Sequence, residues 1–221
     1  MMFGLPTTDP NVATAADLYA MRERDWRCGS IVYQVLVDRF APSERLDAKR
    51  ALYPPPKVLR DWSETPRPGV YLSEARLNSQ ELEFWGGDLA SLYNRLDYVA
   101  ALGAEVLYLN PIHLAYTNHK CDALDFHQIS PEFGTQADFI RLVDEAHRLG
   151  MKVVLDGVFN HMGRNAPFFQ QALADPASPW RDWFDIGPQY AGGARSWTGF
   201  QNLPELNLGN PAVREFIYAG P

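Results

Sequence analysis

The chain of 221 residues is 46% hydrophobic, which is enough to bury a core and fits an ordinary globular domain. Its formal net charge of −7, from 20 Lys and Arg against 27 Asp and Glu, excludes the large basic surface of a nucleic-acid-binding protein. No apolar stretch is long enough to span a membrane, so neither a nucleic acid nor a membrane is an expected partner.

The N-terminal third of the chain predicts one strand between two irregular segments. Residues 1–28 are small and polar, and we expect them to form a tail or short helix. They show no secretory signal pattern, and the whole chain has two cysteines, Cys28 and Cys121. We therefore expect reduced thiols and a cytoplasmic protein. Residues 31–37 are β-branched and apolar and predict the first strand. Residues 41–83 are rich in proline and turn residues and predict a long functional or mobile loop.

Two helix–strand units follow this loop. Apolar residues recur at helical spacing from Leu89 to Gly103, and residues 105–109 then predict the second strand. Thr135 and Asp138 suit a capping box at the start of another helix. Residues 151–155 predict a third strand that is buried on both faces inside a parallel sheet. The alternation of strands and helices predicts an α/β fold with right-handed crossovers.

Polar side chains gather directly after the third predicted strand. Asp156, Asn160 and His161 follow it, and Gly157 allows the backbone to bend between them. The carboxyl ends of parallel strands are where α/β proteins bind ligands, so these residues predict one wall of a site. Taken alone, the pattern fits equally well an aspartate that caps a turn and an ordinary histidine.

The remainder of the chain does not return promptly to a helix and a strand. Residues 162–208 contain clusters of aromatic residues in turn-rich sequence and predict an insertion. Residues 209–221 predict the start of a further helix. His113, His119 and His127 lie close together in the sequence, but their spacing matches no zinc-ligand pattern, and we interpret them as surface histidines.

Residues 156–161 (Asp-Gly-Val-Phe-Asn-His) resemble the first conserved motif of the alpha-amylase family, glycoside hydrolase family 13. Three further stretches resemble other parts of that family in the same order, namely residues 84–89, 110–134 and 203–207. The resemblance runs from about Trp26 to the end of the chain. Within the family, Lys120 and residues 203–207 favour the branch of neopullulanases, cyclomaltodextrinases and maltodextrin glucosidases.

The resemblance implies the N-terminal part of a TIM (β/α)8 barrel with a domain B insertion after strand 3. Residues 29–161 are then the first three strands and two helices of the barrel, with the long loop at 41–83. Residues 162–208 become the domain B that walls the sugar cleft, and residues 209–221 become the start of the next helix. The aromatic clusters of this domain fit internal packing and sugar contact equally well.

The resemblance also implies substrate-binding roles for particular residues. His161 matches the histidine that hydrogen-bonds the reacting sugar, and Asp156 matches the carboxylate that orients an arginine beneath the nucleophile. Asp122 matches an aspartate near the non-reducing end of bound glucose, and His119 belongs to the same segment. Cys121 stands where the family has a tyrosine that stacks on the sugar, and the loss of this ring removes about 1 kcal/mol of contact.

Calcium is the one candidate cofactor that the resemblance implies. Asn160 matches a calcium-binding or structural residue at the root of domain B. Neopullulanases and cyclomaltodextrinases also carry a calcium loop rich in Asn and Asp after the first strand. Here residues 41–45 are Ala-Pro-Ser-Glu-Arg, which offer few hard oxygen ligands, so we do not expect calcium at that place.

A retaining glycosidase needs two carboxyl groups about 5 Å apart. By resemblance, the nucleophile, the acid/base and a third aspartate all lie beyond Pro221, so we expect no catalytic residue within this chain. The implied activity is hydrolysis of α-1,4 or α-1,6 linkages in an α-glucan or maltooligosaccharide by a longer protein, with a homo-oligomer as a candidate assembly. A glycosyltransferase of the same family and a non-catalytic amylase-like binding protein are the alternatives.

Overall fold

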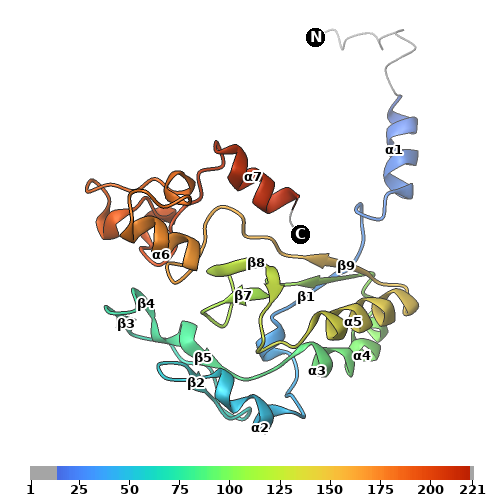
Figure 1. The fold of residues 1–221 in the computed structure, drawn as a ribbon. Coiled ribbons are helices and arrows are strands. Elements are labelled where there is room, and N and C mark those ends of the chain that lie inside the picture. The colour runs from blue at the N-terminus through green and yellow to red at the C-terminus, as the bar shows by residue number, and fades with distance from the viewer. Residues whose placement is uncertain (1–13, 220–221) are drawn as a thin grey trace, which may run out of the picture.

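The computed structural model describes residues 14–219 of the chain. At its centre is a sheet of three parallel strands, β1 (Val32–Val35), β6 (Val106–Leu109) and β9 (Lys152–Leu155), in the order β1-β6-β9 (Figure 1). The register pairs Val32 with Val106 and Val106 with Lys152, so the three strands end at the same edge of the sheet. The predicted α/β class with a parallel sheet is confirmed.

The third strand occupies a different place in the sheet from the one predicted. Within residues 14–219, β6 is the central strand and β9 is an edge strand that pairs only with β6. Lys152 and Leu155 are exposed, whereas Val153 packs against the core. The prediction of an interior strand buried on both faces is therefore wrong for the described residues, because Lys152–Leu155 are exposed or half-buried and β9 lies at an edge of the sheet.

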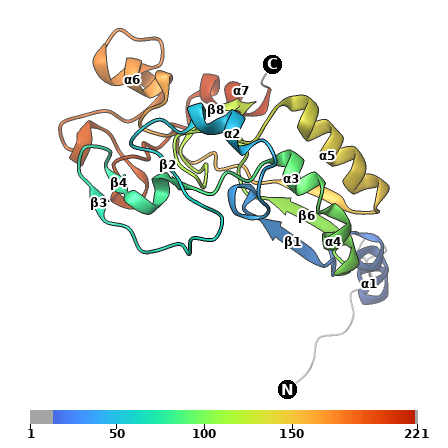
Figure 2. The ribbon, with the colours of Figure 1, turned by 90° about the horizontal axis from the view of Figure 1, so that it is seen from below.

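Three helices pack along the sheet (Figures 1 and 2). They are α3 (Leu89–Tyr93) and α4 (Leu96–Ala101), which connect β1 to β6, and α5 (Gln136–Arg148), which connects β6 to β9. The single helix predicted after Leu89 is divided because Arg95, with φ −123° and ψ 9°, leaves the helical region. The capping box of α5 is present as predicted, with a hydrogen bond from the backbone N–H of Asp138 to Thr135 Oγ1 at 3.2 Å.

The main hydrophobic core lies between the sheet and these helices. It joins one face of β1 and β6 to the apolar stripes of α3, α4 and α5, and its buried members are Val35, Val37, Leu89, Leu92, Leu96, Val99, Ala104, Leu107, Leu109, Ile112, Phe133, Leu142, Ala146 and Met151. The apolar residues that predicted helical spacing after Leu89 are therefore core residues, as the periodicity indicates.

An antiparallel hairpin, which the sequence did not predict, follows β6. It consists of β7 (His113–Ala115) and β8 (Ala123–Ile129), and residues 116–122 connect the two strands. The pairing contains register shifts on either side of Leu114. These irregularities explain why the segment shows no clean alternation of apolar and polar residues that could have indicated a strand pair.

The long connection over residues 41–83 is held by short elements. These are α2 (Leu46–Lys49), β2 (Val58–Leu59), β3 (Tyr71–Leu72), β4 (Leu77–Asn78) and two 3-10 helices at Arg50–Leu52 and Ser79–Leu82. β2 pairs in parallel with β5 (Glu83–Phe84), and β3 pairs with β4 in an antiparallel ribbon. The connection therefore has a defined path beside the sheet.

The segment after β9 forms a second, smaller core. It contains α6 (Pro167–Ala174) and three 3-10 helices at Arg181–Trp183, Ala191–Gly193 and Trp197–Gly199, and it leads into α7 (Pro211–Tyr218). Its buried members are Met162, Ala166, Phe169, Ala172, Trp183, Phe184, Ala194, Leu206 and Val213. Figure 1 shows this segment and the 41–83 connection on the same side of the molecule. A hydrogen bond of 2.6 Å from Arg76 Nη1 to Gln201 Oε1 links them.

The N-terminal helix α1 (Ala15–Arg24) stands away from the rest of the structure (Figure 1). A capping box of Thr14 and Asp17 starts this helix, and none of its residues is buried. Across residues 14–219 the helices are all too short or too polar to cross a membrane.

Candidate functional site

A cavity of about 430 Å³ lies between the segment after β9, the β7–β8 connection and the 41–83 connection. We call it the His161 cavity, after the buried histidine in its wall. Its lining residues are Glu81, His119, Cys121, Val158, Asn160, His161, Trp197, Phe200, Asn202 and Leu203. The cavity therefore combines residues from three parts of the chain, and the segment after β9 contributes two stretches, residues 158–161 and 197–203.

His161 is fixed by the pairing of its own segment with the segment around Glu205. The two residues form an isolated antiparallel bridge, and the backbone N–H of Leu206 donates to Asn160 O at 2.9 Å. The side-chain amide of Asn160 donates to His161 Nδ1 at 3.3 Å, which leaves the ring proton on Nε2. Within residues 14–219, this Nε2 is buried and makes no hydrogen bond of good geometry, although the backbone of Cys121 lies close enough to the ring to raise its pKa slightly against the effect of burial.

The electrostatic environment keeps His161 neutral. Burial lowers its pKa to about 4, because the imidazolium form loses its hydration inside the protein. A neutral imidazole at neutral pH presents one N–H donor at Nε2 rather than a positive charge. His161 is therefore suited to bind an uncharged hydroxyl group.

His119 lies in the same cavity wall and is paired with an acid. Its Nε2 is 3.1 Å from Glu81 Oε2, and Glu81 also accepts the backbone N–H of Asn78 at 2.8 Å. Burial alone would lower the pKa of His119, but its interactions with Cys121 and Glu81 outweigh burial and raise this pKa. The structure thus brings together His119 and His161, which were predicted separately as substrate-binding residues.

Asp122 is not part of the cavity wall. It is only 3% exposed, and its carboxylate accepts the backbone N–H of Thr117 at 3.2 Å and the hydroxyl of the same residue. These bonds close the turn that carries His119 and Cys121. Gly163 packs against this turn so closely that a Cβ there would lie 2.4 Å from Asp122 O. Asp122 therefore stabilises the turn that places His119 and Cys121 in the cavity wall, without lining the cavity itself.

Asp156 is also separated from the His161 cavity. It follows β9 and lines a different cavity of about 280 Å³, together with His113, Phe126 and Phe159. His113 is buried, with its ring 5.3 Å from that of Phe126, so its interpretation as a surface histidine is wrong. The structure therefore divides the predicted site residues between two cavities and one buried turn.

Asn160 is the residue at which the family resemblance implies a calcium-binding or structural role. No group of three or more His, Cys, Asp or Glu side chains in residues 14–219 is arranged to hold a metal ion. Calcium requires six to eight oxygen ligands, whereas the described contact of the Asn160 side chain is with His161. The Asn160 side chain is placed to orient His161, and a calcium-binding role for Asn160 stays a prediction.

The aromatic residues after β9 serve two different purposes. Trp180 and Trp183 contact each other and Phe168 in the second core, with ring centroids 4.7 Å apart between the two tryptophans. Trp197 and Phe200 instead line the His161 cavity, with 44% and 51% of their surface exposed. The Trp197 ring lies 5.6 Å from the His161 ring at an angle of 32°.

Glu81 and Asn202 also line the cavity, although no motif in the sequence indicates either residue. Asn202 is 5% exposed, and its Oδ1 lacks a partner within the described residues. Glu81 lies in the 41–83 connection, whose path depends on contacts with distant residues, such as the bond from the backbone N–H of Asn118 to Glu81 O at 2.9 Å. No local pattern in the sequence encodes such a contact.

The chain was compared with protein families and with individual proteins. Residues 34–219 match the family model for the alpha amylase catalytic domain. The chain is 32% identical over 202 residues to neopullulanase 2 from Thermoactinomyces vulgaris, a match that covers 88% of this chain and 31% of the relative. It is 34% identical over 197 residues to an intracellular maltogenic amylase from Bacillus subtilis, covering 87% and 30%.

Solved structures show the same relationship. The cyclic alpha-maltosyl-(1→6)-maltose hydrolase from Arthrobacter globiformis superimposes with a TM-score of 0.71 at 33% identity, over 86% of this chain and 40% of that protein. The type III pullulan hydrolase from Thermococcus kodakarensis gives a TM-score of 0.73 at 31% identity, over 86% and 35%. The chain spans less than half of each relative, and its three parallel strands are the N-terminal part of a TIM barrel. The chain belongs to the alpha-amylase family of glycoside hydrolases.

Proposed function

We propose that the protein carrying this chain is a glycosidase that hydrolyses α-glucosidic linkages in maltodextrin-like oligosaccharides. The observation that carries the proposal is the His161 cavity, where His161 Nε2 and Asn202 Oδ1 are buried without a partner in the described residues. An unpaired buried polar atom costs about 1–3 kcal/mol. The hydroxyl groups of a sugar would supply both missing partners.

Different residues of the cavity would bind different parts of a sugar ring. His161 donates from Nε2 to a ring hydroxyl, and Asn160 keeps the imidazole in the required tautomer. Paired with Glu81, His119 offers a further polar contact within the cavity. Asp122 fixes the turn that carries His119, and we retain for Asp156 the role of orienting an arginine outside residues 14–219.

Trp197 supplies an aromatic face in this proposal. Sugar rings place their apolar faces on aromatic side chains, and Trp197 lines the cavity with 44% of its surface exposed. Cys121 also lines the cavity and presents a small side chain where an aromatic ring would otherwise narrow it. We therefore expect a wide sugar-binding subsite that relies on Trp197.

The catalytic step requires groups beyond the described residues. A retaining mechanism uses two carboxyl groups about 5 Å apart, one as nucleophile and one as proton donor. We propose that both come from parts of the protein outside residues 14–219. The contribution of this chain is to hold the hydroxyl groups of the reacting sugar and to restrict water around it.

The names of the relatives support this choice of substrate. The solved relatives are named for hydrolysis of cyclic alpha-maltosyl-(1→6)-maltose and of pullulan. A curated relative is named an intracellular maltogenic amylase, and we propose a cytoplasmic location for this protein as well. Assembly into a homo-oligomer stays a prediction.

The test is hydrolysis of maltotriose, pullulan and a cyclomaltodextrin by the protein that carries this chain. We expect His161→Ala to lower kcat/KM by roughly 10²–10³, because its hydrogen bond strengthens in the transition state. His147, which is exposed on α5, provides the control variant His147→Ala and should leave kcat/KM unchanged. Equal activity of the two variants would contradict the proposed role of His161.

The two alternative functions give different outcomes in the same assay. A glycosyltransferase of the family would produce oligosaccharides longer than the substrate, which chromatography of the products detects. If the protein only binds sugar, maltotriose would quench its tryptophan fluorescence through Trp197, but no reducing sugar would be released. Release of reducing sugar without longer products supports the hydrolase.

A further inference from the structure

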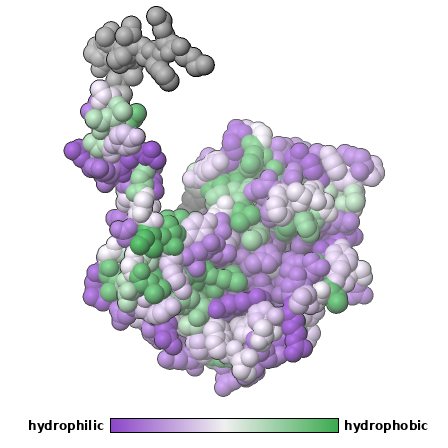
Figure 3. Space-filling view, turned by 180° about the vertical axis from the view of Figure 1, so that it is seen from behind, coloured by the Kyte–Doolittle hydropathy of each residue, from purple (hydrophilic) through white to green (hydrophobic). Residues whose placement is uncertain are grey.

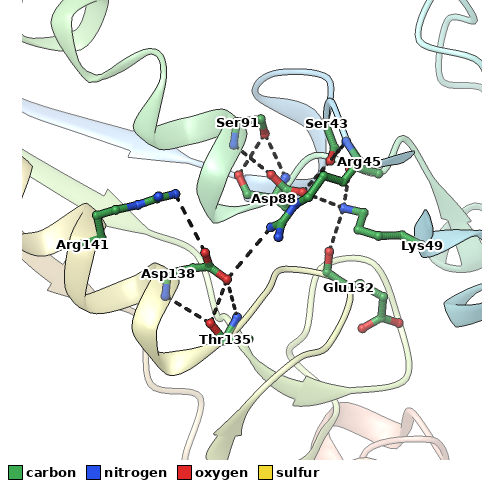
Figure 4. A network of polar contacts seen from close by, with 10 residues as sticks. Ser43, Arg45, Lys49, Asp88, Ser91, Glu132, Thr135, Asp138 and Arg141 are labelled. Atoms are coloured by element: carbon green, nitrogen blue, oxygen red, sulfur yellow. Dashed lines mark hydrogen bonds and ion pairs between the residues drawn. The ribbon is translucent and has the colours of Figure 1, made fainter. Parts of the chain in front are cut away.

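A buried lysine ammonium lies inside a set of oxygen atoms beside the sheet. Lys49, at the end of α2, is 8% exposed. Its Nζ donates to Gly86 O at 2.8 Å, to Glu132 O at 2.9 Å and to Asp88 Oδ2 at 3.0 Å. Figure 4 shows Lys49 reaching between Asp88 and Glu132. Two carbonyl oxygens and one carboxylate oxygen thus surround a single positive charge.

These oxygen atoms are held by contacts that do not involve Lys49. Asp88 Oδ1 accepts the backbone N–H of Ser91 at 2.8 Å, and Oδ2 accepts the hydroxyl of Ser43 at 2.5 Å. Gly86 has a positive φ of 76°, and its N–H donates to Asp38 Oδ1 at 2.9 Å. Gly86 O and Asp88 Oδ2 therefore belong to a backbone segment, residues 86–88, that is held by contacts other than the one with Lys49. The third oxygen, Glu132 O, comes from the segment after β8.

The positive charge of Lys49 is balanced by the oxygen atoms that surround it, as the charge of a bound metal ion would be. Burial lowers the pKa of the Lys49 ammonium, and Asp88 opposes that effect. Burial would raise the pKa of Asp88, but the hydrogen bonds from Ser43 and Ser91 and the charge of Lys49 hold this pKa below its ordinary value. One anion and two carbonyl dipoles therefore neutralise one cation within a water-poor environment.

The oxygen set also has the chemistry of a hard-cation site. Carboxylate, carbonyl and hydroxyl oxygens are the ligands of calcium, and Asp88, Gly86, Glu132 and Ser43 provide them here. These four oxygens are fewer than the six to eight that calcium takes, so water would have to complete the set. A cavity of about 370 Å³, lined by Ser43 and Asp88 but also by the cations Arg45 and Arg141, adjoins it and has room for such water. Lys49 fills the position that the ion would take, so calcium does not fit while the ammonium is present.

We propose that Lys49 serves as a built-in cation, which occupies an oxygen site suited to a metal ion and makes the anchoring of the 41–83 connection independent of calcium. The inference does not rest on the proposed enzymatic activity. Lys49 lies within the connection, whereas its three partners lie after β5 and after β8. The ammonium therefore performs the cross-linking that a bound ion would otherwise provide.

The experiment compares thermal unfolding of the protein that carries this chain with that of Lys49→Ala, in EDTA and in calcium chloride. We expect the midpoint of the unchanged protein to be the same in both solutions. The midpoint of Lys49→Ala should fall by roughly 10 °C in EDTA, because a buried carboxylate loses its partner. It should recover by at least half of this loss in millimolar calcium or ethylammonium, but not in tetramethylammonium, which has no N–H to donate.

Two further variants keep the result decisive. Lys152, exposed on β9, gives the control variant Lys152→Ala, which should show neither the loss nor the recovery. Lys49→Gln keeps most of the side-chain stem for the case in which Lys49→Ala does not fold, and its midpoint should rise with calcium. A calcium-dependent midpoint in the unchanged protein, or no response to calcium or ethylammonium in the Lys49 variants that fold, would overturn the proposal.

Discussion

At the scale of single residues, the polar side chains of the candidate site lie in two separate cavities and one buried turn. His161, His119 and Asn160 line one cavity, whereas Asp122 lies buried behind it and Asp156 lines another. All five were nominated because they follow predicted strands or belong to family motifs. Which side chain reaches the cavity depends on χ angles and on packing partners such as Thr117, and a linear motif contains neither.

Cys121 allows a test of the proposed sugar subsite. Replacing it with tyrosine adds a second aromatic face to the cavity beside that of Trp197, so we expect Cys121→Tyr to bind maltotriose about five- to tenfold more tightly, in line with about 1 kcal/mol of ring contact. Isothermal titration calorimetry measures the change. Cys28→Tyr, at an exposed cysteine, is the matched control. Weaker binding by Cys121→Tyr would mean that the sugar already occupies the space of the new ring.

The buried histidines predict a loss of stability in acid. Burial lowers the pKa values of His113 and His161 to about 4, whereas a histidine in the unfolded chain has a pKa near 6.5. Between these values the unfolded state binds protons that the folded state does not, so the free energy of unfolding decreases as pH falls from 6.5 to 4. The full effect is present below pH 4 and absent above pH 6.5.

Urea unfolding at several pH values measures this effect. We expect His161→Gln to remove about half of the decrease between pH 6.5 and pH 4, and His113→Gln to remove a similar share. Below pH 4.5 the free energy of unfolding should decrease further because of Glu132. Burial would raise the pKa of Glu132, but the charges of Lys120 and Lys57 lower this pKa to about 2. An unchanged slope in both variants would show that these histidines are protonated in the folded protein.

At the scale of elements, the sequence predicted most strands and helices because each carries a strong local signal. The capping box at Thr135 and the apolar stripe of α5 are examples. The β7–β8 hairpin was missed because its register shifts remove the alternation that marks a strand pair. The division of α3 from α4 was missed because the apolar spacing continues across Arg95, whereas the backbone of Arg95 is not helical.

Two identical caps on very different helices provide a prediction at this scale. Thr135 caps α5, which packs against the sheet, and Thr14 caps α1, which has no buried residue. We expect Thr135→Ala to lower the free energy of unfolding by about 1 kcal/mol. Thr14→Ala should leave the free energy of global unfolding unchanged, because α1 frays independently of the core. Urea denaturation of both variants tests this, and equal effects would show that α1 is coupled to the core.

At the scale of the whole molecule, the described residues form a sheet with two unpaired edges. β1 and β9 each pair only with β6, and they leave Val32 and Leu155 exposed by 55% and 48%. Figure 3 shows hydrophobic side chains on the surface below α1. The expected N-terminal part of a (β/α)8 barrel places its second strand between the first and the third, and the order β1-β6-β9 agrees with this. The apolar run of residues 151–155 alone did not indicate an edge, because such a run looks the same at an edge as inside a sheet.

These edges predict how the 221-residue chain behaves when it is produced alone. Unpaired strand edges with apolar side chains favour association, so we expect oligomers or aggregates, binding of a hydrophobic dye and a broad thermal transition. Light scattering coupled to size-exclusion chromatography measures the association. Replacing Leu155 by lysine on the β9 edge should reduce it, whereas the same change at Leu18 on α1 should not. A monodisperse monomer with a sharp transition would contradict this prediction.

Glu132 joins parts of the chain that are distant in sequence. Its carboxylate accepts Lys57 at 2.6 Å and Lys120 at 2.9 Å, and its backbone carbonyl accepts Lys49. Lys120 lies between His119 and Cys121 of the cavity wall, and the other two lysines lie in the 41–83 connection. The energetic effects of substitutions at the three lysines are consequently not additive. A change at one of them alters the constraint on the other two, so the sequence of the connection and that of the cavity wall are expected to evolve together.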